Sequence, residues 1–160
     1  MFELKENSVQ EIKKELGRYE TPYSAIIPSL YVVQKEHGWV SEEAIEYLSK
    51  LMDIPEADIN EVNTFYTMFN KKPTGKYHLQ VCCNISCSMA KARELTDHIL
   101  QKLDLKEGEV TDDGLFTVSR VECLGSCDTA PVIQVGIDKY NENMTVDKTD
   151  QLIADLKAKG

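Results

Sequence analysis

The sequence predicts an α/β protein: an N-terminal helical bundle, residues 1–72, followed by a domain of mixed strands and helices, residues 75–160. Three observations support this division. Apolar residues recur at helical spacing in the first region, whereas short alternating stretches typical of strands appear only in the second. Between the two regions, "KKPTGK" at residues 71–76 is charged and contains Pro and Gly, which is the composition of a linker.

Four helices are expected in the N-terminal domain. Ser8 is placed to cap the first helix, which Gly17 ends. The stretch "SAIIPSLYVVQKEHG" predicts a second helix, and "EEAIEYLSKLMD" predicts a third that is capped by Ser41. Pro55 opens the fourth helix. The residues expected at helical spacing along that fourth helix are Ile59, Val62, Phe65 and Tyr66.

The second domain alternates between strands and helices. "KYHLQVCC", "LFTVSRVEC" and "PVIQVGI" predict three strands, with "DDG" as a turn before the second. Residues 89–103 have helical periodicity, and Thr145 precedes a final amphipathic helix. This order predicts an α/β sandwich for residues 75–160.

The charge of the chain limits its partners. With 27 acidic and 18 basic residues the net charge is -9, which repels nucleic acid and anionic lipid. The apolar runs are short, and "MFELKENSVQEIKKELG" lacks the apolar core of a signal peptide. We therefore expect a cytoplasmic protein without direct membrane insertion. Thiols stay reduced in that compartment, so five cysteines indicate metal or redox chemistry rather than disulfides.

The cysteines form two clusters, "VCCNISC" and "ECLGSC", and each follows a predicted strand. The first offers Cys82-x4-Cys87 or Cys83-x3-Cys87, and the second is Cys123-x3-Cys127. A redox dithiol at a helix start usually has C-x-x-C spacing, which neither cluster has. Four thiolates suit either a structural zinc ion or a [2Fe–2S] cluster. On spacing alone the iron–sulfur cluster ranks first, zinc second and the dithiol third.

The alternation of a strand separates the adjacent cysteines of the first cluster. Cys83 continues an apolar row and is predicted to be a core thiol. Cys82 lies on the more polar face, where it can meet the loops, so Cys82 and Cys87 are the favoured liganding pair. The apolar row is Tyr77, Leu79, Val81 and Cys83, and the other face holds His78, Gln80 and Cys82.

Cys82-x4-Cys87 followed by "ECLGSCDTAPVIQV" resembles the thioredoxin-like [2Fe–2S] ferredoxin subunit of NADH:quinone oxidoreductase, respiratory complex I. The resemblance extends to "AIIPSLYVVQKEHGWVSEEAIEYLSKLMDIPEADINEVNTFYTMF", "LKEGEVTDDGLFTVSRVECLGSCDTAP" and "MTVDKTDQLIADLK", which together span most of the chain. The same family includes the small iron–sulfur subunits of NAD-linked hydrogenases and formate dehydrogenases. The resemblance implies a thioredoxin-like fold, and as cluster ligands it implies Cys82, Cys87, Cys123 and Cys127.

The function implied by the resemblance is electron transfer through one [2Fe–2S] cluster, without a substrate site of its own. The partner would be an NADH- and FMN-binding flavoprotein. FMN and NAD are expected on that partner only, because no G-x-G-x-x-G or GK[ST] motif occurs in this chain. The runner-up is a zinc-stabilised protein-interaction domain that uses the same four cysteines.

Two further positions carry expectations from the same family. Pro131 occupies the place of a proline that thioredoxin-like folds often keep cis. Lys91 stands where relatives often have Gly. The segment "TFYTMF" is expected to lie mostly in the core, with docking through Tyr66, Met68 and Phe69 as the alternative.

Overall fold

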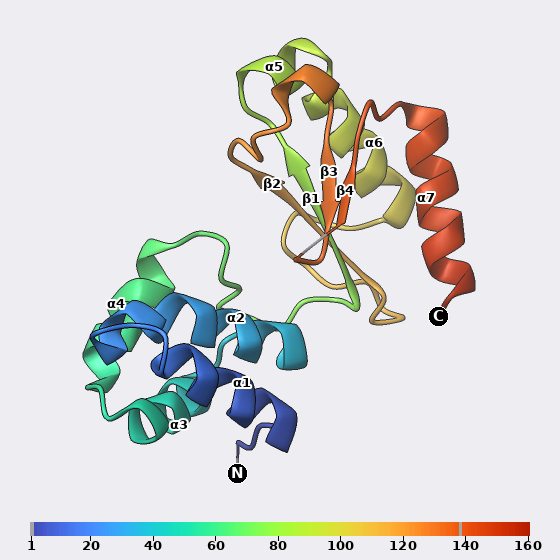
Figure 1. The fold of residues 1–160 in the computed structure, drawn as a ribbon. Coiled ribbons are helices and arrows are strands. Elements are labelled where there is room, and N and C mark those ends of the chain that lie inside the picture. The colour runs from blue at the N-terminus through green and yellow to red at the C-terminus, as the bar shows by residue number, and fades with distance from the viewer. Residues whose placement is uncertain (1, 138) are drawn as a thin grey trace. The chain divides into compact units, whose positions relative to one another are not determined.

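The computed structural model describes residues 2–137 and 139–160, and the chain divides into two compact units, Met1–Pro73 and Thr74–Gly160 (Figure 1). Each unit has its own hydrophobic core. No helix in the described part of the chain is long and apolar enough to cross a membrane. The helices of the N-terminal unit are α1 Glu6–Leu16, the 3-10 turn η1 Pro22–Ala25, α2 Ile26–His37, α3 Glu42–Met52 and α4 Glu56–Phe65.

Local signals set most helix ends of this unit, as predicted. Gly38 ends α2 in the left-handed conformation, with φ of 80°. The Ser41 hydroxyl accepts a hydrogen bond from the backbone N–H of Ala44 at 3.2 Å and caps α3. Both caps confirm the prediction from sequence.

The start of α1 differs from the prediction. The helix begins at Glu6, before the expected cap Ser8. Instead, Glu36 on α2 accepts a hydrogen bond from the Lys5 backbone N–H at 2.9 Å and another from the Ser8 hydroxyl. Burial raises the pKa of Glu36, but these hydrogen bonds outweigh burial and leave the pKa lowered. The cap is supplied by another helix, so no local sequence signal reveals it.

The end of α4 also corrects the prediction. Ile59 is buried as expected, but Phe65 is 78% exposed. Phe65 still belongs to α4, but at about 3.6 residues per turn it falls on a different face of the helix from Ile59. The backbone becomes extended at Tyr66, so the helical spacing does not direct that ring inward. Phe69, placed in the alternative docking surface, is instead a core residue with 1% exposure.

The C-terminal unit is built on a four-stranded sheet in the order β2-β1-β3-β4. Strand β1 pairs in parallel with β2 and antiparallel with β3, which pairs antiparallel with β4. The prediction omitted β4, because this three-residue strand lies at the sheet edge and is largely exposed. The elements are β1 Tyr77–Cys82, α5 Ile85–Met89, α6 Ala92–Leu103, β2 Phe116–Val121, η2 Cys127–Thr129, β3 Ile133–Val135, β4 Lys139–Asn141 and α7 Val146–Ala158.

The topology brings both cysteine segments to one edge of the sheet. Neighbouring parallel strands have their carboxyl ends at the same edge, and Cys82 pairs with Val121 in the β1–β2 register. The chain enters α5 just after β1, and it enters the loop toward η2 just after β2. Figure 1 shows α5 and η2 together at this end of the unit, where the two elements are in contact.

Candidate metal centre

The first cysteine pair lies in the core of the C-terminal unit. Cys82 ends β1 and Cys87 lies on α5, and each is 3% exposed. Asn84 caps α5, with its side-chain oxygen accepting from the Ile85 N–H at 2.8 Å. Burial and, second, a hydrogen bond with Cys82 raise the pKa of the Cys87 thiol to about 11. This environment favours the neutral form of the Cys87 thiol, so a Cys87 thiolate needs a bound cation to balance its charge.

The second pair is exposed to solvent. The Sγ atoms of Cys123 and Cys127 lie 3.6 Å apart. Between them, Gly125 adopts a φ of 80°, and its backbone N–H donates to Cys123 Sγ at 3.4 Å. The hydrogen bond with Cys123 is the main cause that raises the pKa of Cys127. The left-handed conformation of Gly125 therefore turns the loop back on itself, so that both thiols and a backbone N–H donor lie close together.

The two pairs are neighbours. Cys127 interacts electrostatically with both Cys82 and Cys87, and the Ser86 side chain on α5 is close enough to influence the pKa of Cys127. Among residues 2–137 and 139–160, no group of three or more His, Cys, Asp or Glu side chains is arranged around a single metal ion. The structure thus places the four predicted cysteines as two adjacent pairs. Two pairs of thiols match the donor set of a [2Fe–2S] cluster, which takes two thiolates at each iron.

The relative burial of the adjacent cysteines is the reverse of the prediction. Cys83 is half-buried, whereas Cys82 is almost fully buried. Strand β1 is interior to the sheet and is covered on both faces: His78, on the same face as Cys82, is only 9% exposed. Cys83 lies one residue past the end of β1, where it packs against the core and its Sγ is 3.7 Å from Thr96 Oγ1 on α6. The expected contact of Cys83 with the core is present, but the polar, open face expected for Cys82 is not.

Two positions flagged by sequence have distinctive backbone geometry. The Ala130–Pro131 peptide bond is cis, which confirms that expectation. Lys91 lies between α5 and α6 with φ of 66°, a left-handed conformation that glycine adopts without a steric penalty. The same residue interrupts the helix predicted over residues 89–103, so that α6 begins only at Ala92.

Sequence reasoning missed the polar residues that hold the loop of the second pair. Tyr140 donates from its hydroxyl to the Leu124 carbonyl at 2.8 Å, and Ser126 donates to Glu142 at 2.6 Å. Tyr140 lies on the short strand β4, and Glu142 follows that strand. No motif marks either residue, because their role depends on a strand pairing that the sequence pattern did not predict.

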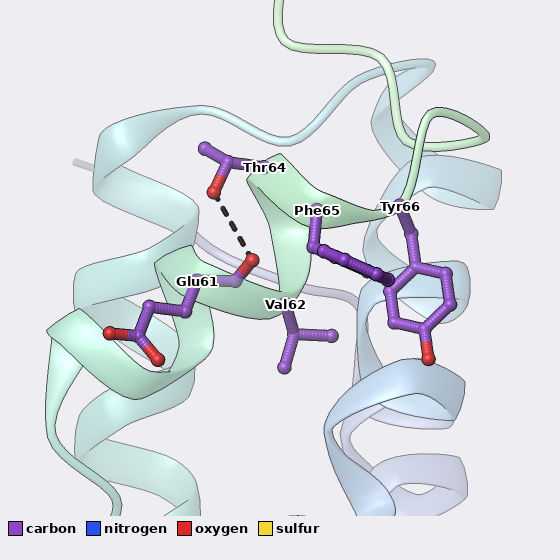
Figure 2. Close-up of a pocket in the computed structure, with 5 residues that line it drawn as sticks. All are labelled: Glu61, Val62, Thr64, Phe65 and Tyr66. Carbon is purple, nitrogen blue, oxygen red and sulfur yellow. Dashed lines mark hydrogen bonds between the residues drawn. The ribbon is translucent and has the colours of Figure 1, made fainter.

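A pocket of about 520 Å³ lies in the N-terminal unit, at the end of α4. Figure 2 shows the Phe65 and Tyr66 rings at its side, and these rings form an edge-to-face pair with centroids 5.1 Å apart. The Thr64 hydroxyl donates to the Glu61 carbonyl at 3.1 Å. The lining residues, Glu61, Val62, Thr64, Phe65 and Tyr66, contain no thiol, and the cysteine pairs belong to the other unit.

Sequence comparison places the chain among known proteins. Residues 12–157 match the family described as thioredoxin-like [2Fe-2S] ferredoxin. The chain is 47% identical over 135 residues to an NADH-quinone oxidoreductase subunit of Thermus thermophilus, covering 84% of this chain and 75% of that protein. It is 40% identical over 149 residues to an NADH-quinone oxidoreductase subunit of Rhizobium meliloti, covering 93% of this chain and 88% of that protein.

A comparison with solved structures supports the fold. The air-oxidized form of an NAD+-reducing [NiFe]-hydrogenase contains a similar region, with a TM-score of 0.72 and 20% sequence identity. The match covers 84% of this chain but only 23% of the hydrogenase chain, and it therefore bears on the fold alone. The family match over most of the sequence, the 40–47% identity and the two cysteine pairs lead to one conclusion. This chain belongs to the thioredoxin-like [2Fe-2S] ferredoxin family, and its cofactor is a [2Fe–2S] cluster.

Proposed function

We propose that this protein is the electron-transfer subunit of an NADH:quinone oxidoreductase, and that it exchanges single electrons with the FMN of a partner flavoprotein that binds NADH. The observation that carries the proposal is the meeting of two cysteine pairs at one edge of the sheet. The relatives with 40–47% identity are named as subunits of NADH-quinone oxidoreductase, which favours this setting over a hydrogenase or formate dehydrogenase.

Within this proposal, Cys82 and Cys87 would hold one iron, and Cys123 and Cys127 would hold the other. When bound, the cluster supplies a centre that accepts and gives up one electron at a time. The protein balances the charge of the donor set. The Gly125 N–H donates to Cys123 Sγ, and the Ser86 side chain partly opposes the raised pKa that Cys123 causes at Cys127. Such donors stabilise thiolate charge and tune the reduction potential.

The proposal assigns NADH and FMN to the partner subunit. The sequence contains neither a G-x-G-x-x-G nor a GK[ST] motif for phosphate binding. The pocket of Figure 2 carries the carboxylate of Glu61 and no Lys or Arg among its lining residues, an unfavourable setting for a nucleotide phosphate.

The first test is the metal content of the protein purified anaerobically. We expect about two irons per chain, visible absorption bands and an EPR signal after one-electron reduction. A colourless protein with one bound zinc ion would instead support the interaction-domain alternative. Co-purification with an FMN-containing flavoprotein, followed by NADH-dependent reduction of the cluster, tests the partner.

The ligand assignment is tested with adjacent cysteines. C82S is expected to lose most of the bound iron, because it removes one of four thiolates, whereas C83S keeps the iron and the spectrum. The pair is well matched, since the two residues are neighbours in the chain and both contact the core. Equal loss from C82S and C83S contradicts the assignment.

A further inference from the structure

Within the loop of the exposed cysteine pair, Leu124 is partly buried and packs against the core of the C-terminal unit. Cys123 and Cys127 are both exposed, and the loop between them contains Gly125 in the left-handed conformation. A loop of this kind has many alternative conformations, and fixing one of them costs conformational entropy. Besides the packing of Leu124, hydrogen bonds from outside the loop therefore help to fix its geometry.

Four such hydrogen bonds come from one segment, residues 140–144, which we call the strap. It runs from β4 toward the start of α7. The strap contacts the chain between residues 124 and 131 at four points along its length. The bonds are Tyr140 Oη to Leu124 O at 2.8 Å, Ser126 Oγ to Glu142 Oε1 at 2.6 Å, Asn143 N to Thr129 O at 2.7 Å, and Met144 N to Pro131 O at 3.0 Å.

Two of these bonds use side chains and lie on either side of Gly125. Tyr140 holds Leu124, the residue after Cys123, and Glu142 holds Ser126, the residue before Cys127. The Ser126 hydroxyl also lies 2.6 Å from Thr129 Oγ1. The strap thus fixes the backbone next to each exposed thiol through residues that are not themselves cysteines.

Glu142 also brings a negative charge to the loop. Hydrogen bonds from Ser126 and Thr129 hold the pKa of its carboxyl below the usual value, and the side chain is ionised at neutral pH. A fixed negative charge near a redox centre opposes the addition of an electron, because the reduced form carries one more negative charge.

We propose that Tyr140 and Glu142 are positioning residues for the [2Fe–2S] cluster: both set the conformation of the Cys123–Cys127 loop, and the Glu142 carboxylate keeps the reduction potential low. This inference rests on the ligand set of the proposed function. It goes beyond that set, because neither residue is a ligand and both come from a segment that follows the last cysteine in the chain.

The test uses three variants of the full-length, cluster-loaded protein. E142Q keeps an oxygen that accepts from Ser126 but removes the charge. E142A removes both, and Y140F removes only the hydroxyl bond to Leu124. The readouts are the midpoint potential, the EPR spectrum of the reduced cluster, and the rate at which a chelator removes iron.

We expect E142Q to shift the midpoint potential upward with an EPR spectrum like that of the wild type. E142A and Y140F are expected to alter the EPR spectrum and to release iron several-fold faster, because the loop loses a point of attachment. The matched control is D112N, which removes an exposed carboxylate ahead of β2, at the opposite edge of the sheet. Its potential and iron release should match those of the wild type.

Two results overturn the inference separately. An E142Q potential equal to that of D112N removes the electrostatic role. Wild-type iron release and EPR spectra in both E142A and Y140F remove the positioning role. A thermal unfolding measurement accompanies each variant, so that a general loss of stability is recognised. Failure of the proposed function is distinct, because it would leave the wild-type protein itself without two irons per chain.

Discussion

The two cysteine pairs of the candidate centre are held in different ways. Cys82, at the end of an interior strand, and Cys87, on α5, are buried in the core of the C-terminal unit. Cys123 and Cys127 are exposed, and hydrogen bonds from the strap fix their loop. One site can therefore contain a pair of thiols that is positioned mainly by packing and a second pair that is positioned mainly by polar contacts. Each half should therefore respond to a different perturbation.

The largest expected effect concerns His78, which lies on the strand that carries Cys82. His78 Nδ1 is buried without a hydrogen-bond partner, and burial lowers the pKa of His78 from 6.5 to about 4. Between these values the unfolded chain binds a proton that the folded protein does not. The free energy of unfolding is therefore unaffected by His78 above pH 6.5. It decreases as the pH falls, by up to about 3 kcal/mol near pH 4.

This prediction is measured by amide hydrogen exchange of β1, corrected for the intrinsic rate at each pH. The H78Q variant serves as the control, because it has no group that titrates in this range. A pH dependence in H78Q as steep as that of the wild type contradicts the assignment to His78. It would also show that burial of His78 on the strand of Cys82 does not cause the expected dependence of stability on pH.

The second prediction compares thiol reactivity directly. In the metal-free protein, iodoacetamide is expected to label Cys123 and Cys127 at least about tenfold faster than Cys82 and Cys87. The exposed thiols meet the reagent without any opening of the structure, whereas the buried thiols react only after local unfolding. Peptide mass spectrometry after timed labelling gives the rates residue by residue.

Labelling in concentrated urea provides the reference, because all five cysteines are then accessible. Equal labelling rates for the two pairs in the folded protein would contradict the distinction between a pair that is protected by packing and a pair in an exposed loop. Slow labelling of the exposed pair alone would reverse it.

The smallest expected effect is at Lys91, which joins the helix of Cys87 to α6. Its positive φ of 66° costs a residue with a side chain about 1–2 kcal/mol relative to an ordinary helical conformation. Lys91→Gly removes this cost and loses part of the gain to the greater entropy of unfolded glycine. We expect the variant to be more stable by about 0.5–1 kcal/mol in urea denaturation.

Lys91→Ala is the matched control, because alanine retains the Cβ atom that causes the strain. If both variants gain equally, removal of the lysine charge is responsible and the backbone is not. A gain in stability for Lys91→Gly alone would show that backbone strain exists next to the helix of Cys87. That strain would be offset in the folded protein by the core around the buried cysteine pair.

The parts of the fold predicted from sequence are those set by neighbouring residues. Gly38, Ser41 and Pro55 mark helix ends through local backbone preferences, and the structure has helix ends at all three. The cap of α1 was missed because Glu36 lies 31 residues from Lys5. The short elements α5 and β4 were missed because five or three residues carry too little periodicity to be recognised.

The candidate site shows the same limit. The spacing of the cysteines predicted which residues to examine, and strand alternation separated Cys82 from Cys83. Alternation gives the face of a strand but not whether that face is covered, so the burial of Cys82 was misjudged. The contribution of Tyr140 and Glu142 depends on tertiary contacts that no pattern in the sequence contains.

The position of the strap in the chain has a consequence for biosynthesis. A ribosome makes all four candidate ligands, Cys82, Cys87, Cys123 and Cys127, before it makes residues 140–144. A nascent chain that ends before the strap has both thiol pairs but has no hydrogen bonds from Tyr140 and Glu142 to the exposed loop. The core around Cys82 and Cys87 also includes Met144, Ile153 and Leu156, so neither pair has its full set of native contacts until this last part of the chain has been made.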